Sequence, residues 1–224
     1  MSDIEENYQN LLSVIQESQG ENKDSKATPT IIAVSKTRTL SEIKNAYDCG
    51  LRDFGENYLQ EAVKKISSFQ HSVDWHFIGS VQSNKTKQIA HYFQWVHTIT
   101  RFKIAEKINR YRNDPMNVCI QVKLQENDGR DSVLINDLPN LAHQISELDN
   151  IKLRGLMGIT TPDIAINKRP RYFNKLAQAF DNLNKEGLGL DTISMGMSDD
   201  YDLAIQNRSN MIRIGTALFG ERSI

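Results

Sequence analysis

Short apolar runs and amphipathic segments alternate regularly along the chain from residue 31 onward. The runs have the composition of strands buried on both faces, and the segments between them carry apolar residues at helical spacing. Strands are expected at 31–35, 51–54, 73–78, 95–99, 118–124, 151–159, 192–195 and 211–214. A further amphipathic helix is expected before the first strand, at 3–18.

Eight strand-and-helix units in 224 residues predict an α/β fold, a single (β/α)8 TIM barrel with an extra N-terminal helix. An open doubly wound sheet is the weaker alternative, because eight evenly spaced strands close more readily than they stay open. The chain contains no linker, low-complexity tract or charge block. We therefore expect residues 1–224 to form one domain.

Composition and charge exclude several classes of protein. A hydrophobic content of 39% and a net charge of −1 are ordinary for a soluble protein and indicate neither nucleic acid nor an anionic membrane as partner. The acidic N-terminus is unlike a signal peptide, and no apolar run approaches the roughly 18 residues needed to span a bilayer. Cys49 and Cys119 have no metal or redox spacing and are expected as small buried residues. We expect a cytoplasmic protein without a metal site.

The first strand ends in a single lysine, Lys36, and Thr39-x-x-Glu42 is a capping box that starts the next helix. Parallel α/β folds place their chemistry at the carboxyl ends of strands. Partial desolvation there would lower the pKa of the lysine and make a neutral, nucleophilic amine accessible. Taken alone, Lys36 is better explained as the point where a buried strand meets water.

The polar residues in and after the second and third strands have roles that the sequence leaves open. Phe54–Asn57 places polar groups where a barrel keeps its site, but a turn with a helix cap explains them equally well. His76 alternates within its strand and could point into the barrel mouth, although an ordinary strand position is slightly favoured. Residues 79–86 nearly match a nucleotide-binding phosphate loop, but Asn84 replaces the glycine that the loop requires.

The ends of the seventh and eighth strands are more informative. Ser198 follows the seventh strand among small residues, and Gly215-Thr216 follows the eighth. Barrels frequently bind phosphate in these two loops, where hydroxyl groups and helix N-terminal amides converge. An amine from the first strand beside such a site suits a phosphorylated carbonyl compound bound as a Schiff base, for example pyridoxal 5′-phosphate.

Five motifs together resemble the pyridoxal phosphate homeostasis protein family. In chain order they are Ala33-Val34-Ser35-Lys36-Thr37, Phe54-Gly55-Glu56-Asn57-Tyr58, Trp75-His76-Phe77-Ile78-Gly79 with Gln82-Ser83-Asn84-Lys85, Ser194-Met195-Gly196-Met197-Ser198-Asp199-Asp200, and Arg213-Ile214-Gly215-Thr216. The resemblance extends from the first strand to Phe219-Gly220. It implies a barrel like the N-terminal domain of alanine racemase, with pyridoxal phosphate as the cofactor.

The resemblance also implies roles for particular residues. Lys36 would carry the Schiff base, and Ser198, Gly215 and Thr216 would hold the phosphate. Asn57 would lie beside the cofactor ring. No catalytic residue is implied, because the family binds the cofactor and hands it on without established turnover.

Arg213 would face the pyridine nitrogen, as in the related racemases. A cation there disfavours protonation of the ring and weakens the cofactor as an electron sink. The implied function is intracellular buffering or delivery of pyridoxal phosphate, with apo-enzymes that need the cofactor as recipients. Since no dimer-forming second domain follows the barrel, a monomer is favoured.

Two alternatives remain open. A small racemase-like enzyme would use Lys36 as its base, and a Schiff-base aldolase would act on a sugar phosphate. The aldolase is the weakest hypothesis, because familiar aldolase lysines come from the sixth strand, where this chain has Met157.

Three loops at the mouth depart from the family pattern. Ser80-Val81 replaces the more usual Pro-Leu, residues 126–131 lack a Lys-x-Gly arrangement, and residues 157–162 replace Met-Ala-Ile-Pro. These departures concern ligand exchange and partner contacts more than formation of the Schiff base.

Overall fold

The computed structural model describes residues 3–20, 28–126 and 128–221. Within these ranges, parallel strands follow one another around a closed barrel in chain order, and the last strand pairs with the first. The strands are β1 (Thr30–Val34), β2 (Asp53–Glu56), β3 (Asp74–Phe77), β4 (Trp95–Ile99), β5 (Met116–Gln121), β6 (Ile151–Met157), β7 (Thr192–Ser194) and β8 (Met211–Ile214). The predicted (β/α)8 barrel is confirmed.

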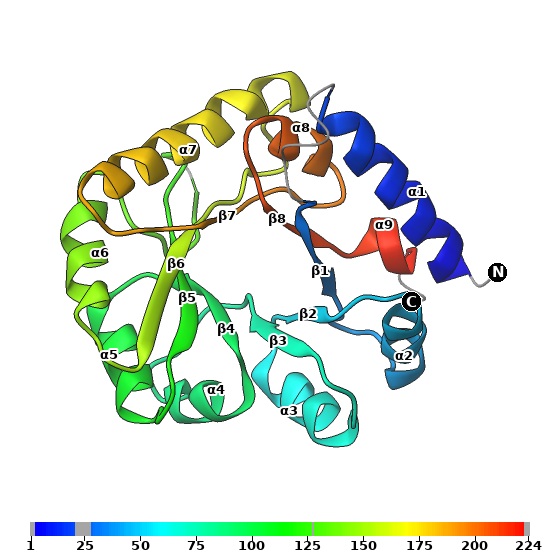
Figure 1. The fold of residues 1–224 in the computed structure, drawn as a ribbon, viewed down its shortest axis with the longest axis horizontal. Coiled ribbons are helices and arrows are strands. Elements are labelled where there is room, and N and C mark those ends of the chain that lie inside the picture. Colours follow the sequence, from blue (N-terminus) through cyan, green and yellow to red (C-terminus); the bar gives the residue numbers. More distant parts are fainter. Residues whose placement is uncertain (1–2, 21–27, 127, 222–224) are drawn as a thin grey trace.

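Helices surround the barrel on its outside (Figure 1). They are α1 (Asp3–Ser18), α2 (Leu40–Asp48), α3 (Leu59–Ser68), α4 (Thr86–Tyr92), α5 (Phe102–Arg110), α6 (Leu138–Ser146), α7 (Arg169–Lys185), α8 (Tyr201–Gln206) and α9 (Thr216–Phe219), with a 3-10 turn η2 (Ile166–Lys168) before α7. The capping box at α2 is confirmed, because the Thr39 and Glu42 backbone N–H groups each donate to the other residue's side chain.

Some strand boundaries differ from the sequence prediction. The second strand was expected at 51–54, but β2 begins two residues later, because the Leu51 N–H donates to the carbonyl of Ala46 and Leu51 belongs to the turn after α2. The fifth was expected to reach residue 124, but β5 ends at Gln121. Beyond it, Val122 and Lys123 pair with Val133 in the following loop.

Apolar side chains fill two layers. The larger layer lies between the barrel and the helices, and a smaller one fills the barrel interior with Ile32, Trp95, Cys119, Met157 and Met211. Cys119 is fully buried as expected, whereas Cys49 is only half-buried. Burying both layers removes most of the apolar surface from water, which is the main driving force for folding.

The extra helix α1 lies beside α9, on the outside of the barrel (Figure 1). Ile4, Leu11 and Ile15 form its buried stripe, at the spacing expected for one helix face. The Asn7 side-chain amide donates to the carbonyl of Leu218 at 3.0 Å. Helix α1 is therefore fastened to α9, the helix that follows β8.

The described residues contain neither a membrane-spanning helix nor a cluster of metal ligands. No helix among them has both the length and the apolar character needed to cross a membrane. No group of three or more His, Cys, Asp or Glu side chains within those same ranges could hold a metal ion.

Close contact between β6 and β7 generates a stability prediction. A Cβ atom added at Gly155 would lie 1.7 Å from the Thr192 carbonyl oxygen, so the two strands can pair only around a glycine. We expect Gly155→Ala to lower the free energy of unfolding by roughly 3 kcal/mol or more, as measured by urea titration. Gly129→Ala is the matched control, because a Cβ there meets open space, and it should change stability by less than about 0.5 kcal/mol.

Candidate functional site

Closure of the barrel brings the ends of β1 and β8 together. Ile32 pairs with Arg213 and Ala33 with Ile214, so Lys36, just beyond the end of β1, emerges at the same mouth as the residues after β8. Lys36 is half-buried. This position at the carboxyl ends of the strands is where barrels place their sites.

The turn that carries Lys36 is held in an unusual conformation. Thr37 has φ = +63°, and a β-branched residue in the left-handed region is strained by about 1–3 kcal/mol. The Thr37 N–H donates to Glu61 Oε1 at 2.6 Å. On the other side of Lys36, the Lys65 ammonium donates to the Ser35 carbonyl at 2.6 Å. Side chains of α3 therefore hold the peptide groups on both sides of Lys36.

Glu56 completes this cluster between the barrel and α3. Its side chain is fully buried, and Oε1 accepts bonds from Ser35 Oγ at 2.7 Å and Lys65 Nζ at 2.8 Å. Burial raises the pKa of the Glu56 carboxyl, although the bonds from Lys65 and Ser35 act in the opposite direction. Oε2 has no partner among the described residues. Glu56 thus has a structural role behind the mouth.

Asn57 follows β2 and lies next to the end of β3. A Cβ at Gly79 would come within 2.0 Å of the Asn57 carbonyl oxygen, so a glycine is required where the two segments touch. The side chain of Asn57 is half-buried, and its buried Oδ1 has no hydrogen-bond partner within the described ranges. Such an oxygen is available to a donor from a ligand or water.

The residues predicted to bind phosphate do lie together. Ser198 Oγ accepts a bond from the Gly215 N–H at 3.3 Å and another from the Ala217 N–H at 3.2 Å. Thr216 is exposed at the start of α9. The Ser198 hydroxyl and two backbone N–H groups therefore meet after β7 and β8, and hydroxyl and amide groups of this kind are typical phosphate ligands.

Asp200 fixes the loop after β7, and the sequence analysis did not single it out. Its side chain is 1% exposed and accepts bonds from the Met197 N–H (2.8 Å), Thr160 Oγ1 (2.9 Å) and Arg169 Nη1 (2.7 Å). These three bonds tie the Ser198 loop to the loop after β6 and to α7.

Arg213 lies on β8 and is almost completely buried. Its guanidinium donates to Ser194 Oγ at 2.8 Å and to the Gly158 carbonyl at 3.0 Å. Burial lowers its pKa to about 10; Asp200 acts against this shift, and the positive charge of Arg130 adds to it. Arg213 remains positively charged at neutral pH.

Arg130 is a second cation close enough to Arg213 to affect its pKa. Its Nε donates to Asp128 Oδ1 at 2.8 Å, while its buried Nη2 has no partner among the described residues. In the sequence, this loop is notable only because it departs from the family pattern. The available signal was an arginine in a strand-end loop, which is too common to single out.

His76 is a strand residue of β3, as the sequence slightly favoured, and its side chain points into the barrel interior. The ring is fully buried, stacks on Trp95 with a centroid distance of 5.3 Å, and contacts His97 and Asp53 through its two nitrogens. Alternation along β3 carried the only signal, and it could not distinguish the interior from the mouth.

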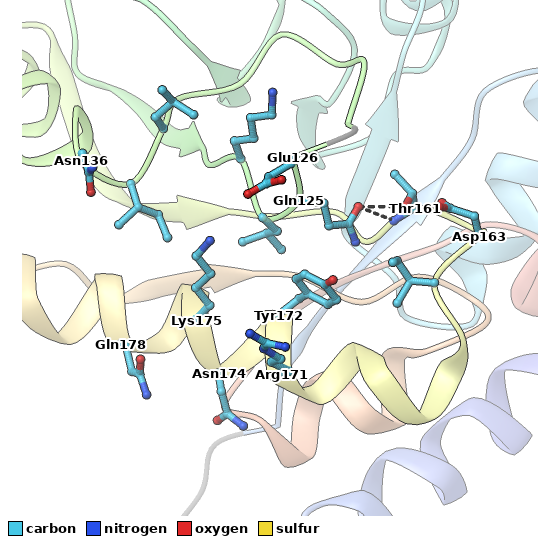
Figure 2. Close-up of a pocket in the computed structure, with 15 residues that line it drawn as sticks. Gln125, Glu126, Asn136, Thr161, Asp163, Arg171, Tyr172, Asn174, Lys175 and Gln178 are labelled. Carbon is cyan, nitrogen blue, oxygen red and sulfur yellow. Dashed lines mark hydrogen bonds between the residues drawn. The ribbon is translucent and has the colours of Figure 1, made fainter.

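A large groove of about 1080 Å³ lies apart from these residues (Figure 2). It runs along the end of β5, the segment before α6, the loop after β6 and the first part of α7. Within it, Gln125 Oε1 accepts bonds from the N–H and hydroxyl groups of Thr161, and Lys175 extends from α7 toward Glu126 (Figure 2). The six predicted site residues do not line this groove.

Pyridoxal phosphate fits the residues present at the mouth. Lys36 supplies an amine, the cluster around Ser198 supplies phosphate donors, and Arg213 on β8 supplies a buried cation. The unpartnered Oδ1 of Asn57 is a further polar atom that a bound ligand can satisfy.

Comparison with known proteins agrees with this arrangement. The family model described as alanine racemase, N-terminal domain, matches residues 4–223. A curated protein from Pseudomonas aeruginosa named pyridoxal phosphate homeostasis protein is 43% identical over 226 residues, which cover 99% of this chain and 97% of that protein. The protein of the same name from Escherichia coli K12 is 42% identical over 200 residues, or 86% of each chain.

Solved structures share the barrel. PipY of Synechococcus elongatus, solved with pyridoxal phosphate bound, has a TM-score of 0.86 and 31% identity, and the match covers 97% of this chain and 100% of PipY. Alanine racemase from Corynebacterium glutamicum has a TM-score of 0.74 at 15% identity; the match covers 96% of this chain but 59% of the racemase, and it shows the fold alone. The chain belongs to the pyridoxal phosphate homeostasis protein family, whose barrel is that of the alanine racemase N-terminal domain.

Proposed function

We propose that this protein binds pyridoxal 5′-phosphate at the barrel mouth through Lys36 and serves its intracellular homeostasis by buffering or delivering it. The observation that carries this proposal is the β1–β8 pairing, which puts the amine of Lys36 at one mouth with the hydroxyl and amide groups around Ser198 and Gly215. The names of the curated relatives and the cofactor bound to PipY support it.

The chain supplies a separate group for each part of the ligand. When bound, the cofactor supplies an aldehyde that condenses reversibly with a neutral amine to a Schiff base, and Lys36 provides that amine. The hydroxyls of Ser198 and Thr216 and the N–H of Gly215 bind the phosphate oxygens. Asn57 lies beside the ring, with a buried Oδ1 that has no hydrogen-bond partner among the described residues.

Arg213 favours retention of the cofactor over chemical turnover. A guanidinium that stays charged at neutral pH, placed at the pyridine nitrogen, disfavours protonation of the ring. An unprotonated ring is a weak electron sink, so cleavage of bonds at an amino-acid α-carbon is not assisted. We therefore propose a binding protein with no catalytic residue.

A racemase-like enzyme that uses Lys36 as its base is the second candidate. The shared fold favours it, but the match covers only 59% of the racemase chain, compared with 97% of the Pseudomonas aeruginosa relative. Deuterium incorporation at the α-carbon of a panel of amino acids separates the two functions. We expect no exchange above that of free pyridoxal phosphate, and fast exchange would favour the enzyme.

If the protein delivers pyridoxal phosphate, its partners are the proteins that receive the cofactor. We propose apo-enzymes that need pyridoxal phosphate as recipients, in the cytoplasm, with the protein acting as a monomer. A net charge of −1 provides no strong long-range attraction, so recognition of a recipient would depend on local contacts.

Loss of the lysine tests the cofactor site directly. We expect Lys36→Ala to abolish the visible absorbance of protein reconstituted with pyridoxal phosphate and to weaken retention by about 100-fold, since the covalent link is lost. Borohydride reduction followed by mass spectrometry should fix one cofactor on the wild type and none on the variant. Lys103→Ala, an exposed lysine on α5, is the matched control and should behave as wild type. Reduction that labels Lys36→Ala equally would contradict the assignment.

The strained turn provides a second test. We expect Glu61→Ala, which removes the acceptor for the Thr37 N–H and one partner of Lys65, to speed release of pyridoxal phosphate about tenfold and to lower unfolding free energy by roughly 1 kcal/mol. Stopped-flow transfer to an apo-enzyme and urea titration measure the two effects. Glu106→Ala removes a comparable helix ion pair with Arg110 and should leave release unchanged. Equal release rates in the two variants would show that the turn does not position Lys36.

A further inference from the structure

A continuous chain of polar groups crosses the barrel interior from one end to the other. Its links are Asp53 Oδ1 to His76 Nε2 (2.9 Å), His76 Nδ1 to His97 Nε2 (2.9 Å), His97 Nδ1 to Ser194 Oγ (3.1 Å) and Ser194 Oγ to Arg213 Nη1 (2.8 Å). The side chains of His76, His97 and Ser194 are completely buried. Four buried polar side chains in the core of a barrel (His76, His97, Ser194 and Arg213) require a reason, because apolar residues fill such space without needing partners.

We propose that His97 and His76 are positioning residues for Arg213, holding its guanidinium at the cofactor through a directional hydrogen-bond chain anchored by Asp53 at the opposite end of the barrel. This inference rests on the proposed function, since it assumes that Arg213 faces a bound pyridine ring.

The two ends of the chain determine the direction of its bonds. Arginine can only donate and an ionised carboxylate can only accept. The Ser194 hydroxyl then donates to His97 Nδ1, the His97 Nε2–H donates to His76 Nδ1, and the His76 Nε2–H donates to Asp53. Every link is satisfied by one proton when both imidazoles are neutral and protonated at Nε2.

The reversed direction is less favourable. It requires a second proton on His76, which places another positive charge in the same core as Arg213. It also makes Ser194 Oγ accept from both His97 and Arg213, which leaves the buried hydroxyl hydrogen without an acceptor among the residues that the structure describes. Burial lowers the pKa of His97 well below its usual range, and the positive charge of Arg213 lowers it further, so His97 stays neutral and its Nδ1 can accept.

Packing prevents the rings from adjusting independently. His76 stacks on Trp95 at an interplanar angle of 13°, and His97 lies 5.7 Å from the same indole, centroid to centroid. At the other end of the hydrogen-bond chain, Arg213 also donates to the Gly158 carbonyl. Two bonds to a planar guanidinium fix its plane, so its remaining N–H groups point in one direction only.

The Asp53 end of the hydrogen-bond chain is in contact with solvent. The Asp53 side chain is 27% exposed and lines a cavity of about 300 Å³ at the amino-terminal ends of the strands, with Asp74, Arg154 and Asp191. A carboxylate anchored there keeps its charge in water while it orients buried imidazoles. Changes at this end of the barrel should therefore affect the cofactor at the other end.

The first arm of the test uses the protein without cofactor. Nitrogen-15 NMR of the histidine rings at about pH 7.5 should show neutral His76 and His97 protonated at Nε2. An Nδ1–H tautomer on His97, or a doubly protonated His76, would overturn the proposed direction. This result does not depend on whether pyridoxal phosphate binds.

The second arm uses the loaded protein. We expect His97→Phe, which keeps the ring shape but breaks two links, to shift the pH midpoint of the cofactor's visible absorbance and to speed its release about tenfold. Borohydride reduction should still fix the cofactor on Lys36 in this variant. Met157→Leu, a volume-conserving change in the same interior layer, is the control and should leave both quantities at wild-type values.

Substitution at the solvent end keeps the test decisive if His97→Phe does not fold. Asp53→Asn retains an acceptor for His76 and should behave nearly as wild type, whereas Asp53→Leu should shift the absorbance midpoint in the same direction as His97→Phe. An unchanged midpoint in Asp53→Leu and His97→Phe would overturn the positioning role. If wild-type protein is not labelled at Lys36, the proposed function fails. The NMR measurement still decides whether the hydrogen-bond chain has the proposed direction.

Acid stability provides an independent prediction from His97. Because its pKa in the folded protein lies below that of the unfolded chain, about 6.5, stability is fully present above that value and declines as the pH falls toward the folded-state pKa. Wild type should therefore lose more stability than His97→Phe when urea titrations at about pH 7.5 and pH 5 are compared. An equal loss in both proteins would contradict a buried neutral His97.

Discussion

Pairing of the first strand with the last is the constraint on which the site depends. Residues separated by about 180 positions meet only because Ile32 lies opposite Arg213 in the closed sheet. The amine after β1 and the hydroxyl and amide groups after β7 and β8 then share one mouth without any long loop to bring them together. An open sheet with the same strands would separate β1 from β8, and the residues of the site would no longer lie together.

Elements with a strong local pattern could be predicted from the sequence. The order of strands and helices followed from periodicity, and the meeting of Ser198 with Gly215 followed from their places after consecutive strands. Both depend on short-range rules: each strand ends where its polar residues begin, and parallel strands end at the same edge. The β2 boundary was wrong because Leu51 is apolar yet belongs to a turn, which hydrophobicity alone cannot reveal.

Features that depend on several distant residues could not be predicted. The left-handed Thr37 is held by Glu61 from another helix, and nothing in the local sequence indicates a positive φ at a threonine. The interior chain likewise joins side chains from β2, β3, β4, β7 and β8, and although Arg213 was singled out in the sequence, nothing there indicates that Asp53, His76, His97 and Ser194 connect to it. Partners in such networks are fixed by barrel shear and register, and these quantities emerge only when the sheet closes.

The attachment of α1 to α9 has a consequence for synthesis on the ribosome. Helix α1 packs beside α9, and its Asn7 side-chain amide donates to the carbonyl of Leu218. Both partners are translated roughly 200 residues later than α1. At bacterial-type elongation rates of about 5–20 residues per second, the nascent chain exposes this apolar helix and an unclosed sheet edge for on the order of ten seconds or more.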